Sequence, residues 1–172
     1  MEFFCATLSE NYFAKDLIVL EKIIGELLRE KNLTIACAES CTGGLLTSKL
    51  TDVAGSSDYV QGSIVSYSNE VKNKILRVKT ETLKNFGAVS YETAFEMAAN
   101  VRDIFETDIG VGITGIAGPG GGTAEKPVGT VYISVADKNN VSVKKFNFSG
   151  TRTEIKNQSA QSAMAMLEQI LK

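Results

Sequence analysis

The stretch TIACAESCTGGLL, which runs from Thr34 to Leu46, decides how the chain folds. It has a β-branched start, continues through small and hydroxyl residues, and ends in an apolar pattern typical of a helix. This order predicts a strand, a tight loop that contains Ser40, and a helix start. Free backbone N–H groups at a helix start favour anions, so a hydroxyl there is placed for acyl or phosphate chemistry. The alternative is that Ser40 or Thr42 only caps the helix.

The composition is that of a soluble globular protein. The 172 residues fit one domain with a core that needs no disulfides, and the net charge of −2 supplies no basic field for nucleic acid. No apolar run approaches the roughly 18 residues of a membrane span, and residues 1–15 lack the pattern of a secretory signal. Three cysteines without a framework of spacings fit a reducing compartment. We therefore expect a cytoplasmic protein without nucleic-acid or membrane partners.

The chain contains no histidine. This absence excludes Ser-His-Asp triads, Cys-His proteases, histidine-liganded zinc and acid/base catalysis by histidine. Any general base must therefore be a lysine, aspartate, glutamate, tyrosine or cysteine.

The order of predicted elements indicates the fold class. We expect an extension over residues 1–14, followed by a single domain over residues 15–172. Apolar spacing and turn signals predict helices at 15–32, 43–52 and 80–85 and helix starts near 68, 90 and 151, with strands at 33–38, 59–67, 108–114, 128–136 and 141–148. This alternation favours a three-layer α/β/α sandwich with a mixed, mainly parallel sheet of about five strands. The hairpin at 137–140 supplies its one antiparallel strand.

Two glycine-rich segments have different meanings. Residues Gly110–Gly115 match the spelling G-x-G-x-x-G, but they lie within a predicted strand and lead to a loop, so they are not a dinucleotide-binding fingerprint. The loop 114–127 has five glycines in the eight positions 115–122, which would let its backbone approach a ligand closely. The alternative for this loop is a flexible linker.

The residues beside Ser40 leave several interpretations open. Cys37 and Cys41 are spaced C-x3-C, which is weak evidence for a metal without histidine or a second cysteine pair. Cys37 is better explained as a small buried hydrophobe, with a redox role for the two thiols as a rival. Glu39 either acts as a base beside Ser40 or points outward from the strand end.

Lys72 gains meaning from its expected place in the sheet. A lone helix lysine is normally a solvated surface residue. However, the helix start after Tyr67 should lie at the same carboxyl edge of the sheet as Ser40, where α/β proteins bind ligands. A lysine desolvated there loses its proton more easily, and Ser-Lys pairs activate a hydroxyl without histidine.

Five motifs occur in an order that resembles a known family. They are AESCTGG at 38–44, YSNEVK at 67–72, GAVS at 87–90, TGIAGP at 114–119 and EKPVGTV at 125–131. Together they resemble the CinA C-terminal domain family from about Leu17 to the end of the chain. The resemblance implies a three-layer α/β/α sandwich in the stand-alone form, without the N-terminal domain of longer members.

The resemblance also implies an activity. Characterised members of the family are nicotinamide mononucleotide deamidases, which form nicotinate mononucleotide and ammonia in pyridine nucleotide salvage. By motif matching, Ser40 is the nucleophile, Lys72 the dyad lysine and Tyr67 an active-site tyrosine. The reaction passes through an acyl-enzyme without a metal or cofactor, commonly in a homodimer. Thr42 then takes the capping role considered for Ser40.

Substrate-binding residues follow from the same motifs. The amides of Thr42, Gly43 and Gly44 would hold the oxyanion. The expected contacts to the mononucleotide, including its phosphate, come from Asn69, Thr114, Gly115, Gly118 and Arg152. The sequence departs from the family pattern at three positions, with Thr151 for aspartate, Lys156 for arginine and Arg77 for glycine. The rival function is a catalytically inactive nucleotide-binding or regulatory module of the same family.

Overall fold

The computed structural model describes residues 20–172, so the extension predicted over residues 1–14 lies outside the described residues. Five strands form one sheet in the order β2-β1-β3-β4-β5. Their bounds are β1 Ile35–Glu39, β2 Val60–Val65, β3 Ile109–Gly115, β4 Thr130–Ala136 and β5 Val141–Asn147. β1 pairs in parallel with β2 and β3, whereas β4 is antiparallel to both of its neighbours. The expected mixed sheet with a single reversed strand is therefore confirmed.

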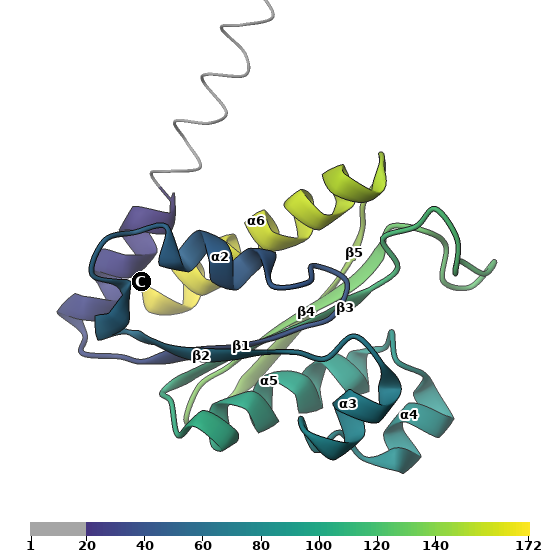
Figure 1. Ribbon diagram of the computed structural model, residues 1–172, viewed down its shortest axis with the longest axis horizontal. Helices are drawn as coiled ribbons and strands as arrows, with labels where there is room; N and C mark the ends of the chain where they lie inside the picture. Colours follow the sequence, from purple (N-terminus) through teal and green to yellow (C-terminus); the bar gives the residue numbers. More distant parts are fainter. Residues whose placement is uncertain (1–19) are drawn as a thin grey trace, which may run out of the picture.

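Helices cover both faces of the sheet (Figure 1). One face carries α5, Tyr91–Phe105, together with the short helices α3, Asn69–Lys74, and α4, Thr80–Phe86. The other face carries α2, Leu45–Thr51, α6, Arg152–Leu171, and the helical residues 20–30, with a 3₁₀ turn at Ser56–Asp58. The three-layer α/β/α prediction is confirmed. Within residues 20–172, no helix has both the length and the apolar character needed to cross a membrane.

β1 is buried along its whole length because helices cover it on both sides. Side chains alternate between the two faces of a strand. Ile35 and Cys37 belong to the core cluster that includes Leu46 of α2 and Leu167 of α6. Ala36 and Ala38 belong to the opposite cluster, with Met97 and Val101 of α5. The strand IACAE thus consists of small and apolar residues up to Glu39, whose buried carboxylate needs a separate explanation.

The glycines of β3 allow α5 to pack closely on the sheet. A Cβ atom at Gly112 would lie 2.8 Å from the carbonyl oxygen of Ala94 and 2.6 Å from Ser134 Oγ. A Cβ atom at Gly110 would collide with the carbonyl oxygen of Ala98. The G-x-G-x-x-G spelling therefore reflects helix–strand packing, and the prediction that these glycines lie inside a strand is confirmed.

Local capping signals determine where three helices begin. Ser68, Ser90 and Thr151 cap α3, α5 and α6 through their side-chain hydroxyls, and Thr151 forms a full capping box with Glu154. The capping role expected for Thr42 is wrong. The N-cap of α2 is Gly44 with a φ of 94°, and the Thr42 hydroxyl, buried, has no hydrogen-bond partner in the described part of the chain.

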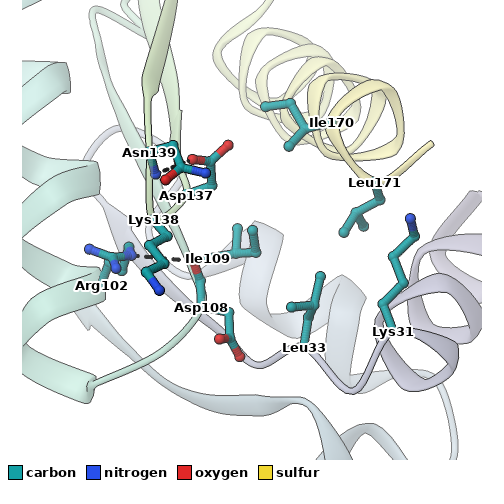
Figure 2. Close-up of a pocket in the computed structure, with 10 residues that line it drawn as sticks. All are labelled: Lys31, Leu33, Arg102, Asp108, Ile109, Asp137, Lys138, Asn139, Ile170 and Leu171. Carbon is teal, nitrogen blue, oxygen red and sulfur yellow. Dashed lines mark hydrogen bonds between the residues drawn. The ribbon is translucent and has the colours of Figure 1, made fainter.

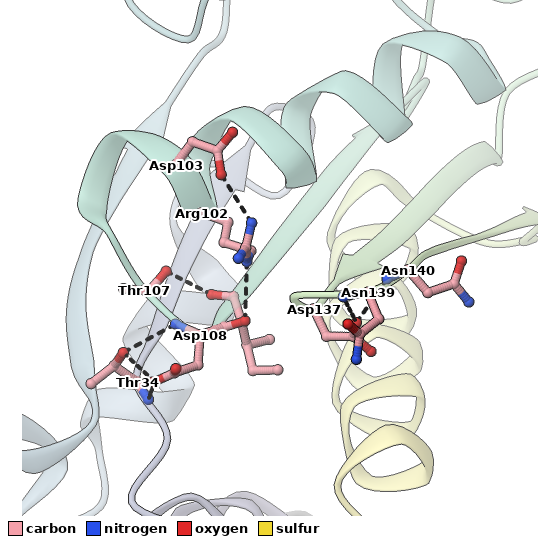
Figure 3. Close-up of polar contacts among 9 residues, drawn as sticks. Thr34, Arg102, Asp103, Thr107, Asp108, Asp137, Asn139 and Asn140 are labelled. Carbon is pink, nitrogen blue, oxygen red and sulfur yellow. Dashed lines mark hydrogen bonds and ion pairs between the residues drawn. The ribbon is translucent and has the colours of Figure 1, made fainter.

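At the opposite edge of the sheet, where the parallel strands begin, Asp108 connects two neighbouring segments of the chain (Figure 3). Its Oδ2 accepts hydrogen bonds from the backbone N–H of Thr34 at 2.8 Å and from Thr34 Oγ1 at 2.9 Å. The N–H of Asp108 donates to Thr34 Oγ1 in return, at 3.2 Å. These contacts connect the segments that lead into β1 and β3, far along the strands from Ser40.

Candidate active site

The carboxyl ends of β1, β2 and β3 meet at one edge of the sheet, where the segments that follow them surround a cavity of about 270 Å³. Ligands in α/β folds commonly bind at such an edge. Seven of the individually expected site residues line this cavity: Ser40, Tyr67, Lys72, Thr114, Gly115, Gly118 and Arg152. The cavity therefore collects residues from the loop after β1, from α3, from β3 and from α6.

Ser40 and Lys72 are in direct contact inside this cavity. Lys72 Nζ lies 2.9 Å from Ser40 Oγ and donates to the carbonyl oxygen of Ser66 at 2.6 Å. The Ser68 cap starts α3 immediately after β2, and this places Lys72, only 1% exposed, against the Ser40 loop. The carbonyl of Ser66 fixes the direction of the amine, and no sequence signal could have identified it because every residue carries a carbonyl.

The electrostatic environment makes Lys72 easier to deprotonate. Burial penalises the charged ammonium and lowers the pKa of Lys72 from 10.5 to about 8, against a smaller opposing effect of Cys41. Among residues 20–172, no carboxylate lies within ion-pair distance of Lys72. At pH 7 about a tenth of the lysine is therefore neutral, far more than of a lysine with an ordinary pKa, and the neutral form is the one that a general base requires.

Glu39 is neither a base beside Ser40 nor outward-pointing, so both expectations for it are wrong. Its buried carboxylate lies at the N-terminal end of α2. Oε2 accepts from the backbone N–H of Gly44 at 3.0 Å and of Leu46 at 3.1 Å, and Oε1 accepts from the Thr47 N–H at 2.8 Å and the Thr47 hydroxyl at 2.7 Å. This carboxylate satisfies the helix start, which explains why no side chain of the loop caps it.

The loop amides differ from the expected oxyanion donors. The N–H of Ser40 donates to the carbonyl of Ile113 at 2.9 Å, and the N–H of Gly43 to the carbonyl of Ser40 at 3.2 Å. The N–H of Gly44 donates to Glu39. Two of the three expected amides, those of Gly43 and Gly44, are thus engaged within the loop. Thr42, Gly43, Gly44 and Asn69 are not among the residues that line the cavity.

Arg152 spans the mouth of the cavity. Its Nη2 donates to Tyr67 Oη at 2.8 Å, and its Nη1 donates to the carbonyl of Gly118 at 2.7 Å. Tyr67 is 63% exposed, so the tyrosine ring stands at the entrance. Lys156, one turn further along α6, places its Nζ near the backbone of Gly43. Within the described chain neither Arg152 nor Lys156 forms an ion pair with a carboxylate, so Arg152 brings an uncompensated positive charge to the mouth and Lys156 a second one to the neighbouring loop.

The glycine-rich loop and the segment before α5 form the remaining walls. Thr114 Oγ1 donates to the carbonyl of Ala88 at 2.6 Å and so holds the segment 87–89 against β3. Sequence reasoning did not assign seven of the lining residues: Cys41, Ala88, Val89, Ile116, Ala117, Gly120 and Gly121. All seven lie in segments that the sequence had singled out: Cys41 in AESCTGG, Ala88 and Val89 in GAVS, and the other four in the glycine-rich loop 114–127.

The two described cysteines are unsuited to redox or nucleophilic chemistry. Cys37 and Cys41 are free and buried. Burial raises the pKa of Cys41 to about 11, and burial together with the charge of Glu39 raises that of Cys37 as well. Thiols with raised pKa values carry little of the reactive thiolate. Within residues 20–172, no group of three or more cysteine, aspartate or glutamate side chains could hold a metal ion.

A Cys37→Ala variant is expected to keep the turnover number of the wild type and to lose some stability. The side chain fills space in the core and does not line the cavity, so its removal leaves a small void away from Ser40. Steady-state kinetics and thermal unfolding of the same preparation measure the two effects. A loss of turnover that oxidants reproduce in the wild type would support the redox interpretation instead.

A second cavity, of about 340 Å³, lies at the amino edge of the sheet (Figure 2). Its apolar floor includes Ile109 and Leu171, and its charged groups include Asp108 and Arg102. Asp108 already accepts two hydrogen bonds from Thr34, and Arg102 pairs with Asp103. Although this cavity is larger, it contains no buried titratable side chain comparable to Lys72, so the smaller cavity is the candidate active site.

Comparison with known proteins agrees with the fold and with the motif order. Residues 18–171 match the family described as CinA C-terminal domain. A CinA-like protein of Endomicrobium trichonymphae is 49% identical over 164 residues, which cover 95% of this chain and 38% of that protein. A CinA-like protein of Kosmotoga olearia is 51% identical over 152 residues, covering 88% of this chain and 37% of that protein. The chain thus spans less than two fifths of the length of these relatives.

Solved structures show the same architecture. The crystal structure of a competence/damage inducible protein from Agrobacterium tumefaciens matches with a TM-score of 0.89 at 41% identity, covering 91% of this chain and 96% of that one. A competence or damage-inducible protein from Enterobacter asburiae matches with a TM-score of 0.88 at 34% identity, covering 91% and 98%. Since the family match extends over nearly all of the sequence and the relatives share about half of their aligned residues with it, this chain belongs to the CinA C-terminal domain family.

Proposed function

We propose that this protein hydrolyses the carboxamide of nicotinamide mononucleotide, giving nicotinate mononucleotide and ammonia. The observation that carries the proposal is the contact between Lys72 Nζ and Ser40 Oγ, 2.9 Å, in a cavity where burial lowers the lysine pKa to about 8. A hydroxyl beside a buried, partly neutral amine is the arrangement that acyl transfer needs when histidine is absent. Membership of the CinA family supports a small nucleotide as the substrate.

The proposed reaction has two steps. Neutral Lys72 accepts the Ser40 proton while Ser40 Oγ attacks the carboxamide carbon, and the resulting ammonium protonates the departing nitrogen, so that ammonia leaves and an ester remains. Lys72 then takes a proton from water, which attacks the ester carbon, and returns it to Ser40 Oγ as the acid is released. The carbonyl of Ser66, which accepts from Nζ at 2.6 Å, keeps the amine directed at Ser40 throughout.

Two roles remain to be assigned, the stabilisation of the oxyanion and the binding of the phosphate. In the described loop, the amide of Cys41 donates to no backbone oxygen or carboxylate, and Cys41 lines the cavity, so this amide replaces those of Gly43 and Gly44 as the proposed oxyanion donor. Arg152 at the mouth and Lys156 at the neighbouring loop supply positive charge for the 5′-phosphate of the mononucleotide. Arg152 would exchange its contact with Tyr67 for the phosphate when substrate binds.

We also propose a cytoplasmic location and a homodimer for this protein. The two buried free thiols are compatible with a reducing compartment. The homodimer is carried over from the family resemblance, and light scattering during size-exclusion chromatography tests it.

The deciding experiment is an ammonia-release assay on purified protein with nicotinamide mononucleotide, with nicotinate mononucleotide identified by mass spectrometry. We expect equal amounts of the two products from the wild type and none above background from protein that lacks the Ser40 hydroxyl. Binding of the mononucleotide by calorimetry without release of ammonia would refute the enzyme and favour the inactive nucleotide-binding module.

The pH dependence of kcat/KM is expected to follow the ionisation of Lys72. The neutral amine is the base, so kcat/KM should rise tenfold per pH unit at acidic pH and level off above an apparent pKa near 8. Initial rates between pH 6 and about 10 measure this profile, with buffers of constant ionic strength. A profile that is flat through this range would show that no group with the ionisation of Lys72 controls the reaction.

A further inference from the structure

We propose that Glu39 is a positioning residue, which holds the Ser40 loop in the geometry that presents the hydroxyl to Lys72. This inference rests on the proposed function only in taking Ser40 as the nucleophile. Glu39 is the last residue of β1 and directly precedes Ser40, yet its side chain turns to the opposite face of the sheet, toward α2. It therefore acts on the nucleophile through the backbone.

The carboxylate of Glu39 gathers the loop around itself. Its two oxygens accept hydrogen bonds from donors five to eight positions further along the chain, on Gly44, Leu46 and Thr47, at 2.7–3.1 Å. Ser40 lies between this carboxylate and the first of these donors. Because both ends of the segment 39–44 are held at one point, and because Ser40 itself bonds to Ile113 and Gly43, the loop has little freedom to move.

The position of the Glu39 carboxylate also affects Lys72. A buried carboxylate needs a compensating partner, and the N-terminal end of α2 supplies it through three backbone N–H groups. Lys72 is thereby left without a carboxylate partner among residues 20–172, although a glutamate directly precedes Ser40. A direct ion pair would raise the pKa of the lysine and keep the amine protonated. The helix start thus keeps the glutamate away from the base.

An ordinary helix cap would produce some of the same contacts, so the test requires a matched carboxylate elsewhere. Asp108 is suitable because it also accepts from the backbone N–H and the hydroxyl of one threonine, Thr34, at the far edge of the sheet (Figure 3). Asp108→Asn removes a charge from a comparable set of hydrogen bonds without touching the Ser40 loop. Glu39→Gln has the shape of the native side chain but can accept on one oxygen only, so one pair of donors loses its acceptor.

The experiment measures the reactivity of Ser40 in two independent ways. The first is kcat and KM with nicotinamide mononucleotide. The second is the rate of covalent labelling by an alkyl fluorophosphonate, in which Ser40 Oγ forms a bond to phosphorus, fluoride leaves, and Lys72 takes the serine proton. The label needs no substrate recognition, so it reports on the nucleophile even if another amide is the true substrate. Thermal unfolding of each variant is recorded at the same pH.

We expect Glu39→Gln to lower kcat and the labelling rate together by about 100-fold, with a small change in KM, because a displacement of the nucleophile by about 1 Å has an effect of that size. The pH of half-maximal labelling should stay near 8, since the surroundings of Lys72 are unchanged. Asp108→Asn should lower the unfolding temperature and leave both rates as in the wild type. Equal rates in Glu39→Gln and wild type would overturn the proposal and leave Glu39 as a helix cap.

Three further outcomes are informative. If Glu39→Gln does not fold, the Thr47→Val variant takes its place, since it removes only the hydroxyl that donates to Glu39 Oε1. Slower labelling of Thr47→Val supports the positioning role, and unchanged labelling overturns it. If the wild type is labelled at Ser40 and slowed by Glu39→Gln but releases no ammonia from the mononucleotide, the proposed substrate is wrong and the role of Glu39 stands. Absence of labelling at Ser40 in the wild type overturns the positioning role.

Discussion

Replacement of Lys72 by methionine is expected to abolish turnover and at the same time to make the protein more stable at pH 7. The variant loses the amine that contacts Ser40 Oγ, so kcat should fall by about 10⁴-fold or more. Methionine is unbranched and of similar length, so it fills the buried space that the lysine side chain occupies without adding a charge. Loss of activity with gain of stability is the combination expected of a buried catalytic group.

The stability effect follows from the pKa of Lys72. The value falls from 10.5 in the unfolded chain to about 8 in the folded protein, which corresponds to a penalty of about 3 kcal/mol for the protonated form. The penalty is fully present below pH 8, declines as the pH rises, and is absent above about 10.5. The variant also loses two hydrogen bonds, each worth about 1 kcal/mol, so its net gain at pH 7 is about 1 kcal/mol.

Denaturant unfolding at several pH values measures this prediction. The wild type should gain about 3 kcal/mol relative to Lys72→Met between pH 7 and pH 10.5, because its own penalty disappears over that range. A constant difference between the two proteins across this range would mean that the lysine has an ordinary pKa and is no better a base than an exposed lysine. In that case the Ser-Lys mechanism would lose its main physical support.

Replacement of Ser40 by alanine is expected to have the largest effect on activity, a loss of about 10⁵-fold or more in kcat, because no acyl-enzyme can form. Affinity for the mononucleotide should change little, since Ser40 contributes one hydroxyl among the groups that line the cavity. Ammonia release under single-turnover conditions measures the first quantity, and calorimetric titration measures the second. Fluorophosphonate labelling should be lost in the same variant.

Ser63→Ala is the matched control for this variant. Ser63 lies in β2, and its hydroxyl is buried without a hydrogen-bond partner among the described residues. The replacement therefore removes a serine hydroxyl near the same sheet without touching the cavity, and turnover should be that of the wild type. Retention of most activity by Ser40→Ala would exclude the acyl-enzyme and leave direct attack of water, with Lys72 as its base, as the mechanism.

Much of the site could be predicted because strand ends are local features. The alternation of strands and helices predicted that Ser40 and Lys72 would reach the same sheet edge, and the structure places them 2.9 Å apart. The Ser68 cap explains why this works, since it starts α3 directly after β2 with Lys72 on the buried side. The helix caps at Ser90 and Thr151 could also be predicted from the sequence, because each hydroxyl and the amide that it caps lie within three residues of one another.

The loop after β1 could not be predicted in the same way. Serine and threonine in the sequence ESCTGG suggested a hydroxyl cap, but the N-cap position belongs to Gly44 and the helix start is satisfied by Glu39 from inside the sheet. That contact depends on the path of the whole loop, which bends back so that a strand residue reaches amides five to eight positions later. The same path engages the amides of Gly43 and Gly44 that were expected to hold an oxyanion.

By itself, the sequence determined the element order, the helix starts and the absence of histidine chemistry, because periodicity and short-range hydrogen bonding act within a few residues. The pair Ser40 and Lys72 was an expectation from the sheet edge that the family resemblance strengthened. Only the tertiary structure decided the pKa of Lys72, the partner of Glu39 and the position of Arg152 across the cavity mouth. Each of these depends on burial or on contacts between segments far apart in the chain. Arg152 meets Gly118 and Tyr67 because α6 packs back over the sheet, and Lys72 loses its proton easily because the fold excludes water around it.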